Sequence, residues 1–166
     1  MGTSYHIGRG RTRLMFDPSK SLHQKIFAQN FLKNPGISRE LVRASGITLN
    51  DTVIEIGPGK GMLTRELAAV AGRVFAVESD QKLAGKLKAA FGQERNVTIV
   101  CGDFLAYDIR EENYNVFSNI PFNITNRIVK KLLLAQNPPK NAWLFTQKEA
   151  TERLAGIPYE QEFSIL

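Results

Sequence analysis

The sequence predicts an α/β fold with a doubly wound, mostly parallel sheet, and three observations lead to this prediction. From residue 52 onward, short β-branched segments alternate with segments of helical length. A glycine-rich segment directly follows the first of these strands, where the chain turns into a helix. The 166 residues are 43% hydrophobic and 23% charged, which suits one ordinary globular domain with a sizeable core.

The strands and the first helix follow from side-chain spacing. A helix is expected between Pro35-Gly36 and about Gly46, because Ile37, Leu41 and Val42 share one face, which Ile47 can extend. Five later segments are short and mostly rich in β-branched or aromatic residues, as strands are: 52–56, 74–77, 97–100, 115–118 and 142–145. Right-handed crossovers between parallel strands would place helices on both faces of the sheet.

The helices between these strands are expected at 62–71, 80–91 and 124–135, and a further helix begins within 148–154. The first is rich in Ala and Leu and stops at Gly72, and the second has Ser79 or Asp80 as its N-cap. Residues 163–166 are an apolar run with no terminator after it. We therefore expect the chain to be cut short and the fold to be incomplete at its C-terminus.

Positive charge is unevenly distributed along the chain. Twenty-two Lys and Arg residues against sixteen Asp and Glu give a net charge of +6, and residues 1–25 carry five basic residues against one acid. Residues 1–22 lack apolar periodicity, so we interpret them as a flexible basic arm and residues 23–166 as the folded domain. The charge indicates a polyanionic partner, although a solvated tail explains the arm equally well. The candidate RNA contacts are Arg9, Arg11, Arg13, Lys20 and Lys25.

Cysteine and histidine are scarce. Cys101 is the single cysteine, which excludes an internal disulfide, and we expect it to be buried as a small hydrophobic residue. His6 and His23 both lie near the N-terminus, which disfavours a histidine-rich site, so no metal is expected. The apolar runs are too short to cross a membrane, and the start lacks the apolar region of a secretory signal. We expect a cytoplasmic protein that acts as a monomer.

The segment from Glu55 to Gly61 reads Glu-Ile-Gly-Pro-Gly-Lys-Gly and joins the first of these strands to a helix. Glycines there let the backbone approach a ligand closely, beside the helix N-terminus. Glu78 ends the next strand, where nucleotide-binding folds place a carboxylate that accepts both ribose hydroxyl protons. Together with Gly57 and Gly59, this acid indicates an adenosine-containing cofactor. A solvated charge at a helix entrance is the alternative interpretation of Glu78.

An aspartate and a phenylalanine follow the strand at 97–100. Asp103 lies just past the carboxyl end of that strand, in the crevice where open α/β sheets bind ligands. Its carboxylate can accept a hydrogen bond from an exocyclic amine such as adenine N6, while Phe104 lies against the ring. The alternative is an ordinary turn aspartate beside a core phenylalanine.

The segment Asn119-Ile120-Pro121-Phe122 follows the strand at 115–118. Pro121 biases Ile120 toward an extended backbone and cannot itself donate a hydrogen bond. The side-chain oxygen of Asn119 and the carbonyl of Ile120 can then accept both N–H bonds of a planar amino group, and Phe122 can stack on the attached base. An ordinary turn would explain the proline and the aromatic ring but not the asparagine.

Taken in order, the segments at 29–32, 55–61, 78, 102–104 and 119–122 resemble the motifs of the S-adenosylmethionine-dependent ribosomal RNA adenine N6-methyltransferases. The resemblance covers the chain from about residue 27 to its end, and it implies a Rossmann-like, class I methyltransferase domain. The Asn-Ile-Pro-Phe segment and Lys60-Gly61 are more similar to the Erm resistance methyltransferases of 23S rRNA than to the dimethyladenosine transferases of small-subunit rRNA. Phe122 replaces the commoner tyrosine, so any role of that hydroxyl is lost here.

The resemblance implies methyl transfer to N6 of an adenine in 23S rRNA, with macrolide-type antibiotic resistance, and the small-subunit reaction is the alternative. Family members carry further strands and a helical RNA-binding domain that this sequence lacks. The residues implied to contact the cofactor, from its methionine end to its adenine, are Gln29, Asn30, Leu32, Gly57, Gly59, Gly61, Glu78, Ser79, Asp103, Phe104 and Asn119. The residues implied to hold the target base are Asn119, Ile120, Pro121 and Phe122.

Two functions of other classes stay open from the sequence. A nicotinamide-dependent oxidoreductase uses a similar fold, but its loop needs a third glycine where Met62 stands here. A non-catalytic RNA-binding factor on the methyltransferase scaffold would bind ribosomal RNA without transferring a methyl group.

Overall fold

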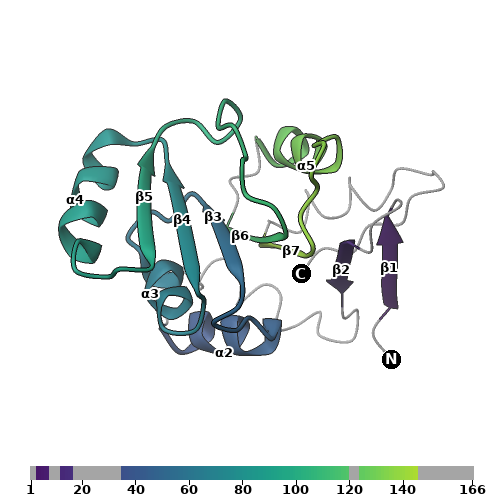
Figure 1. Cartoon of the computed structure of the whole chain (residues 1–166), viewed down its shortest axis with the longest axis horizontal. Helices are drawn as coiled ribbons and strands as arrows, with labels where there is room; N and C mark the ends of the chain where they lie inside the picture. Colours follow the sequence, from purple (N-terminus) through teal and green to yellow (C-terminus); the bar gives the residue numbers. More distant parts are fainter. Residues whose placement is uncertain (1–2, 8–11, 17–34, 120–123, 146–166) are drawn as a thin grey trace.

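A five-stranded parallel sheet forms the centre of the computed structural model, which describes residues 3–7, 12–16, 35–119 and 124–145. In spatial order (Figure 1), the strands are β5 (Val97–Cys101), β4 (Arg73–Glu78), β3 (Thr52–Ile56), β6 (Tyr114–Asn119) and β7 (Ala142–Phe145). All four neighbouring pairs are parallel. The chain runs outward from β3 through β4 to β5 and then returns to the other side of β3, so the strand order reverses between β3 and β6.

Helices cover both faces of this sheet, as the predicted doubly wound fold requires (Figure 1). Val53 and Trp143 belong to a buried cluster on the face covered by the first two helices, and Phe91 of the third helix packs at Gly61, where the second begins. Ile56 belongs to the cluster on the opposite face, which the last helix covers. The helices are α2 (Pro35–Ser45), α3 (Met62–Ala68), α4 (Gln81–Phe91) and α5 (Thr125–Leu133). The α/β prediction is confirmed, and none of the helices in the described ranges is long and apolar enough to span a membrane.

The predicted strands and the helices before residue 146 are all present, with boundaries shifted by a few residues. Of the two candidate caps for α4, Asp80 occupies the N-cap, and its Oδ1 accepts the N–H groups of Lys82 at 2.7 Å and Leu83 at 2.9 Å. The helix predicted within 148–154 lies outside the described residues.

The prediction that Cys101 is buried is wrong, because its side chain is exposed. Cys101 ends β5, which lies at the edge of the sheet and pairs with β4 on one side. Residues of an edge strand have fewer neighbours than residues of a central strand, so an apolar strand sequence does not ensure burial there. The central strand β3, by contrast, is buried at all five positions.

Two strands within residues 1–22 were not predicted. Strands β1 (Thr3–Ile7) and β2 (Thr12–Phe16) pair antiparallel, with Tyr5 opposite Leu14, and β2 lies beside β7 (Figure 1). Both segments contain β-branched or aromatic residues, and the four residues between them include two glycines, which is a hairpin pattern that the high charge obscured. The flexibility of residues 1–22 stays a prediction.

Candidate functional site

The carboxyl ends of four parallel strands meet around a cavity of about 210 Å³, beside the reversal of strand order. Open α/β sheets bind their ligands at this position. The predicted site residues that line the cavity are Gly57, Glu78, Ser79, Asp103, Phe104 and Asn119. Four strand ends therefore bring together predicted site residues that are up to 62 positions apart in the sequence.

Three glycines shape the turn between β3 and α3. Gly57, Gly59 and Gly61 have φ angles of 67°, 57° and 78°, a left-handed conformation that other residues rarely adopt. A Cβ atom at Gly57 or Gly59 would meet no atom within 4 Å, whereas one at Gly61 would lie 2.7 Å from the Phe91 ring. The first two glycines thus leave open space beside the backbone, and the third permits close packing of α3 against α4.

Glu78 is buried at the end of β4, and both of its carboxylate oxygens accept backbone hydrogen bonds. Oε2 accepts the N–H of Gly59 at 3.0 Å, and Oε1 accepts the N–H of Asp80 at 2.9 Å. A carboxylate has about four acceptor positions, so these two bonds leave capacity for the hydroxyl groups of a ligand. The interpretation of Glu78 as a solvated charge is not supported, because the residue is only 6% exposed.

The turn after β5 carries Asp103 at the surface and Phe104 inside. Oδ1 of the exposed Asp103 accepts the N–H of Leu105 at 2.8 Å, which fixes the direction of the carboxylate. Phe104 is 4% exposed and belongs to the core cluster under α5, yet it also lines the cavity. The ring of Phe104 is therefore both a core residue and part of the cavity wall, as the two interpretations from the sequence proposed.

Asn119 ends β6 and lies half-buried at the wall of the cavity. The preceding residue, Ser118, is completely buried, and its hydroxyl donates to the carbonyl of Ile56 in β3 at 2.8 Å. This bond ties the ends of β3 and β6 together at the point where the strand order reverses. Sequence reasoning missed Ser118, although a small polar residue beside the asparagine in an otherwise buried strand was a usable signal.

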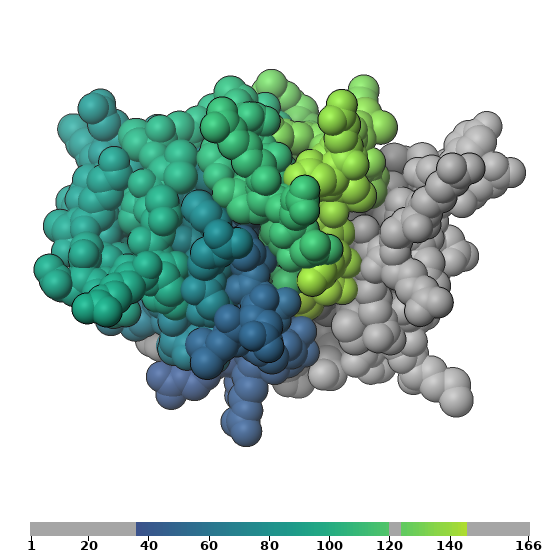
Figure 2. Space-filling model, viewed as in Figure 1, coloured from purple at the N-terminus to yellow at the C-terminus, as the bar shows by residue number. Residues whose placement is uncertain are grey.

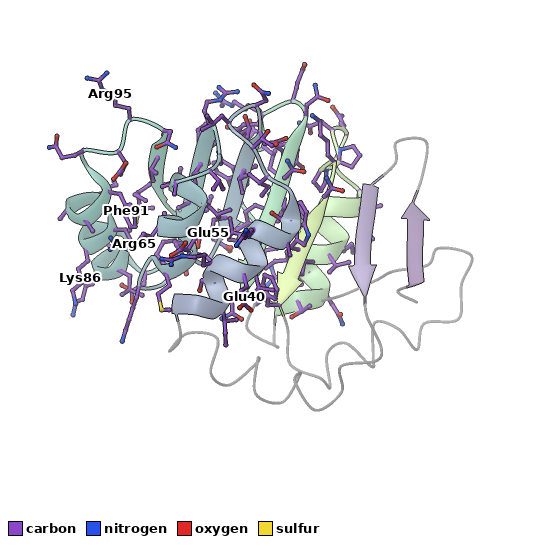
Figure 3. The ribbon with its side chains drawn as sticks, turned by 90° about the horizontal axis from the view of Figure 1, so that it is seen from below. Glu40, Glu55, Arg65, Lys86, Phe91 and Arg95 are labelled. Atoms are coloured by element: carbon purple, nitrogen blue, oxygen red, sulfur yellow. The ribbon has the colours of Figure 1, made fainter. Side chains whose placement is uncertain are left out.

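Glu55 is in β3, two residues before Gly57. Because strand side chains alternate, its side chain points to the face of the sheet opposite that of Ile54 and Ile56. Burial is the main reason why the pKa of Glu55 rises from 4.5 to about 7, and the charge of Glu78 raises it further while Thr64 opposes the rise. Neither Oε2 of Glu55 nor the Thr64 hydroxyl has a well-aligned partner in the described ranges. Figure 3 places Glu55 within the body of the fold.

Several predicted site residues lie outside the described part of the chain. These are Gln29, Asn30 and Leu32 for the cofactor, Ile120, Pro121 and Phe122 for the target base, and Arg9, Arg11, Lys20 and Lys25 for RNA. Arg13 is in β2, opposite His6 in the hairpin. The roles of these residues stay predictions.

A family model described as "Ribosomal RNA adenine dimethylase" matches residues 20–166 of the chain. A ribosomal RNA small subunit methyltransferase A from Acaryochloris marina is 38% identical over 151 residues, which cover 85% of this chain and 56% of the relative. An rRNA adenine N-6-methyltransferase from Aeromicrobium erythreum is also 38% identical, over 133 residues that cover 80% of this chain and 39% of the relative. The chain thus spans about half the length of most curated relatives it matches.

Solved structures that match this chain are also methyltransferases of these kinds. The 23S rRNA methyltransferase ErmE matches with a TM-score of 0.68 and 29% identity, over 78% of this chain and 53% of that chain. A dimethyladenosine transferase from Plasmodium falciparum matches with a TM-score of 0.66 and 30% identity, over 75% of this chain and 46% of that chain. The chain therefore shares its fold with a 23S rRNA methyltransferase and with a dimethyladenosine transferase.

Proposed function

The chain belongs to the ribosomal RNA adenine dimethylase family, and from this premise we propose that it transfers methyl groups from S-adenosylmethionine to N6 of an adenine in ribosomal RNA. S-adenosylmethionine is the cofactor of this family and of its structural neighbours. The observation that carries the proposal is that Glu78, Asp103 and Asn119 line one cavity, at the reversal of strand order.

The residues around the cavity fit this cofactor. The open space beside Gly57 and Gly59 lets an extended ligand pass close to the backbone, and the unused acceptor positions of Glu78 suit the two ribose hydroxyls. Asp103 can accept a hydrogen bond from the adenine amino group. Ser79 beside the ribose would complete the set, with Gln29, Asn30 and Leu32 at the methionine end and Gly61 closing the loop.

The target base would be held by the segment that begins at Asn119. The exocyclic nitrogen of adenine is a poor nucleophile because its lone pair is delocalised into the ring. Accepting its two hydrogens at Asn119 Oδ1 and the Ile120 carbonyl would turn the lone pair toward the electrophilic methyl group that the sulfonium cofactor supplies. Positioning of this kind can lower a barrier by about 7–11 kcal/mol. Stacking on Phe122, in a backbone fixed by Pro121, would keep the flipped base in place.

Small-subunit rRNA is the target that the relatives favour. Most of the similar curated proteins are small-subunit methyltransferases, so they support the alternative from the sequence better than the 23S rRNA reaction. The Asn-Ile-Pro-Phe segment and the similarity to ErmE keep 23S rRNA as the second candidate, and resistance belongs only to that candidate. A cytoplasmic monomer stays a prediction from the sequence.

The experiment is transfer of a labelled methyl group from S-adenosylmethionine to protein-free 16S and 23S rRNA, followed by mapping of the modified base. We expect label on N6 of an adenine in 16S rRNA. Label only in 23S rRNA would reverse the choice of substrate, and binding of RNA without any label would favour the non-catalytic function. Binding of a nicotinamide cofactor in place of S-adenosylmethionine would contradict the proposed chemistry altogether.

A further inference from the structure

Lys131 joins the turn after β5 to helix α5. Its Nζ donates to the carbonyl of Leu105 at 3.0 Å and to the carbonyl of Tyr107 at 2.6 Å, and it lies 5.2 Å from the centroid of the Phe104 ring. The ammonium group has three N–H donors and no acceptor, so two backbone oxygens and an aromatic face suit it well. Lys131 is half-buried, whereas its neighbour Lys130 is exposed.

Lys131 satisfies the oxygens that the turn cannot satisfy by itself. Within the turn, Asp103 accepts the N–H of Leu105 with its side chain and the N–H of Ala106 with its carbonyl. The N–H of Tyr107 donates to the carbonyl of Phe104. These three N–H groups are thus paired inside the turn, while the carbonyls of Leu105 and Tyr107 accept from the ammonium group of Lys131 in α5.

The two elements that Lys131 joins are two walls of the same cavity. Asp103, Phe104 and Leu105 form part of one wall, and Ile124 and Ile128 at the start of α5 form part of the other. In Figure 2, helix α5 lies next to the segment that follows β5, on one face of the molecule. A change in this contact would alter the distance between the walls, although Lys131 itself does not line the cavity.

We propose that Lys131 is a positioning residue for cofactor recognition, which holds the Asp103–Phe104 turn against α5 and so fixes the wall that receives the adenine ring. The inference rests on the proposed function, since it assigns the adenine end of the cofactor to this turn. Lys131 touches neither cofactor nor base in this scheme. It acts through the backbone carbonyls of Leu105 and Tyr107 and through the ring of Phe104.

The test compares Lys131→Met, Lys131→Arg and Lys130→Met in the full chain. Methionine keeps the apolar stem and removes the donors, arginine keeps donors, and Lys130→Met removes an adjacent exposed lysine as the matched control. Calorimetry would measure binding of S-adenosylhomocysteine and of its inosine analogue, which lacks the adenine amino group. The ratio of the two dissociation constants measures how strongly the site prefers the adenine amino group. A general loss of folded protein would not change this ratio.

We expect Lys131→Met to weaken S-adenosylhomocysteine binding about tenfold and to reduce the preference over the inosine analogue. Lys131→Arg should recover most of both, and Lys130→Met should change neither. An unchanged ratio and affinity in Lys131→Met, with normal binding by the wild type, would overturn this inference alone. Failure of the wild type to bind S-adenosylhomocysteine would instead overturn the proposed function.

Hydrogen exchange supplies a second readout that needs no ligand. Lys131→Met should speed amide exchange in residues 103–109 and leave α4 and β4 as they are, because the lost bonds belong to one turn. Exchange that rises equally in all elements would mean that Lys131 supports the fold in general, which contradicts a positioning role.

Discussion

Gly59 donates its backbone N–H to Oε2 of Glu78 at 3.0 Å, across 19 residues of chain. The other oxygen of the same carboxylate accepts the N–H of Asp80, the residue that caps α4. One buried side chain therefore ties the glycine turn, the end of β4 and the start of α4 to each other. The carboxylate that would meet the ribose is held in place before any ligand binds, which lowers the entropic cost of binding.

Replacing Glu78 with Gln should weaken S-adenosylhomocysteine binding by about one to two orders of magnitude, because hydrogen bonds to charged groups contribute about 1.5–3 kcal/mol. The glutamine amide also directs an N–H group toward one of two N–H donors, Gly59 or Asp80. Calorimetry measures the dissociation constant. Glu94→Gln, which neutralises an exposed acid, is the control. Equal affinity in Glu78→Gln would contradict a role for this carboxylate at the ribose.

The glycine turn permits a prediction that separates stability from binding. Gly61→Ala should lower the free energy of unfolding by about 2–4 kcal/mol, since left-handed strain adds to a Cβ placed 2.7 Å from Phe91 and 2.8 Å from Leu87. Gly59→Ala should cost only about 1–2 kcal/mol of strain, because its Cβ would meet no atom within 4 Å. Urea unfolding measures both. The prediction fails if the two variants lose equal stability.

Ligand binding should respond to these two substitutions in the opposite order to stability. Gly59→Ala should weaken binding more than Gly61→Ala does. Gly59→Ala fills space beside the loop where the cofactor would pass, so it should weaken S-adenosylhomocysteine binding at least tenfold in protein that remains folded. Unchanged affinity in that variant would mean that the open space beside Gly59 is not used by the ligand.

Local patterns predicted most of the fold, and contacts distant in sequence explain what they missed. The cap at Ser79 or Asp80, the glycine-rich turn after β3 and the strands β3 to β7 all depend on neighbouring residues, so local sequence patterns were sufficient. Lys131 reaches carbonyls 24 and 26 residues away, which no local pattern encodes. The exposure of Cys101 depends on which strand lies at the edge, and this is known only once the strand order is known.

Glu55 should make stability depend on pH. Its pKa is about 7 in the folded chain and 4.5 when exposed, so the folded state binds more protons than the unfolded state between these values. Stability from this group is therefore fully present below pH 4.5, falls as the pH rises toward 7, and then stays level. The total loss is on the order of a few kcal/mol.

The variant Glu55→Gln isolates this contribution, because glutamine has the shape of a protonated glutamate and no charge to titrate. Near pH 5 the two proteins should unfold at similar urea concentrations, and near pH 8 the variant should be the more stable one. Thr64→Val removes the nearby hydroxyl that lowers this pKa, so this variant should lose more stability between pH 5 and pH 8 than the wild type loses. A stability difference that does not change between pH 5 and pH 8 would mean that Glu55 is not protonated in the folded chain.

Asn119→Ala should strongly reduce the rate of methyl transfer while leaving the affinity for S-adenosylhomocysteine within about threefold. The expected loss of rate is about a hundredfold or more, the size found when one positioned hydrogen-bonding group is removed from an active site. Methyl transfer is measured as labelled RNA retained on a filter, and calorimetry measures the affinity for S-adenosylhomocysteine. Asn50→Ala, which truncates an exposed asparagine at the opposite end of the sheet, is the control. Wild-type turnover by Asn119→Ala would remove this residue from the mechanism.

Removing the charge of the N-terminal arm should weaken RNA binding without changing cofactor affinity. Deletion of residues 1–22 would also remove β2 from beside β7, so a variant with Gln at Arg9, Arg11, Arg13 and Lys20 is the sharper test. If these four cations meet phosphates, the slope of log affinity against log salt should flatten by up to about 3, because each contact releases about 0.7 of a counterion from single-stranded RNA. Titrations at several salt concentrations measure the slope. A slope equal to that of the wild type would assign RNA binding to the folded domain, whose own excess of charge is small.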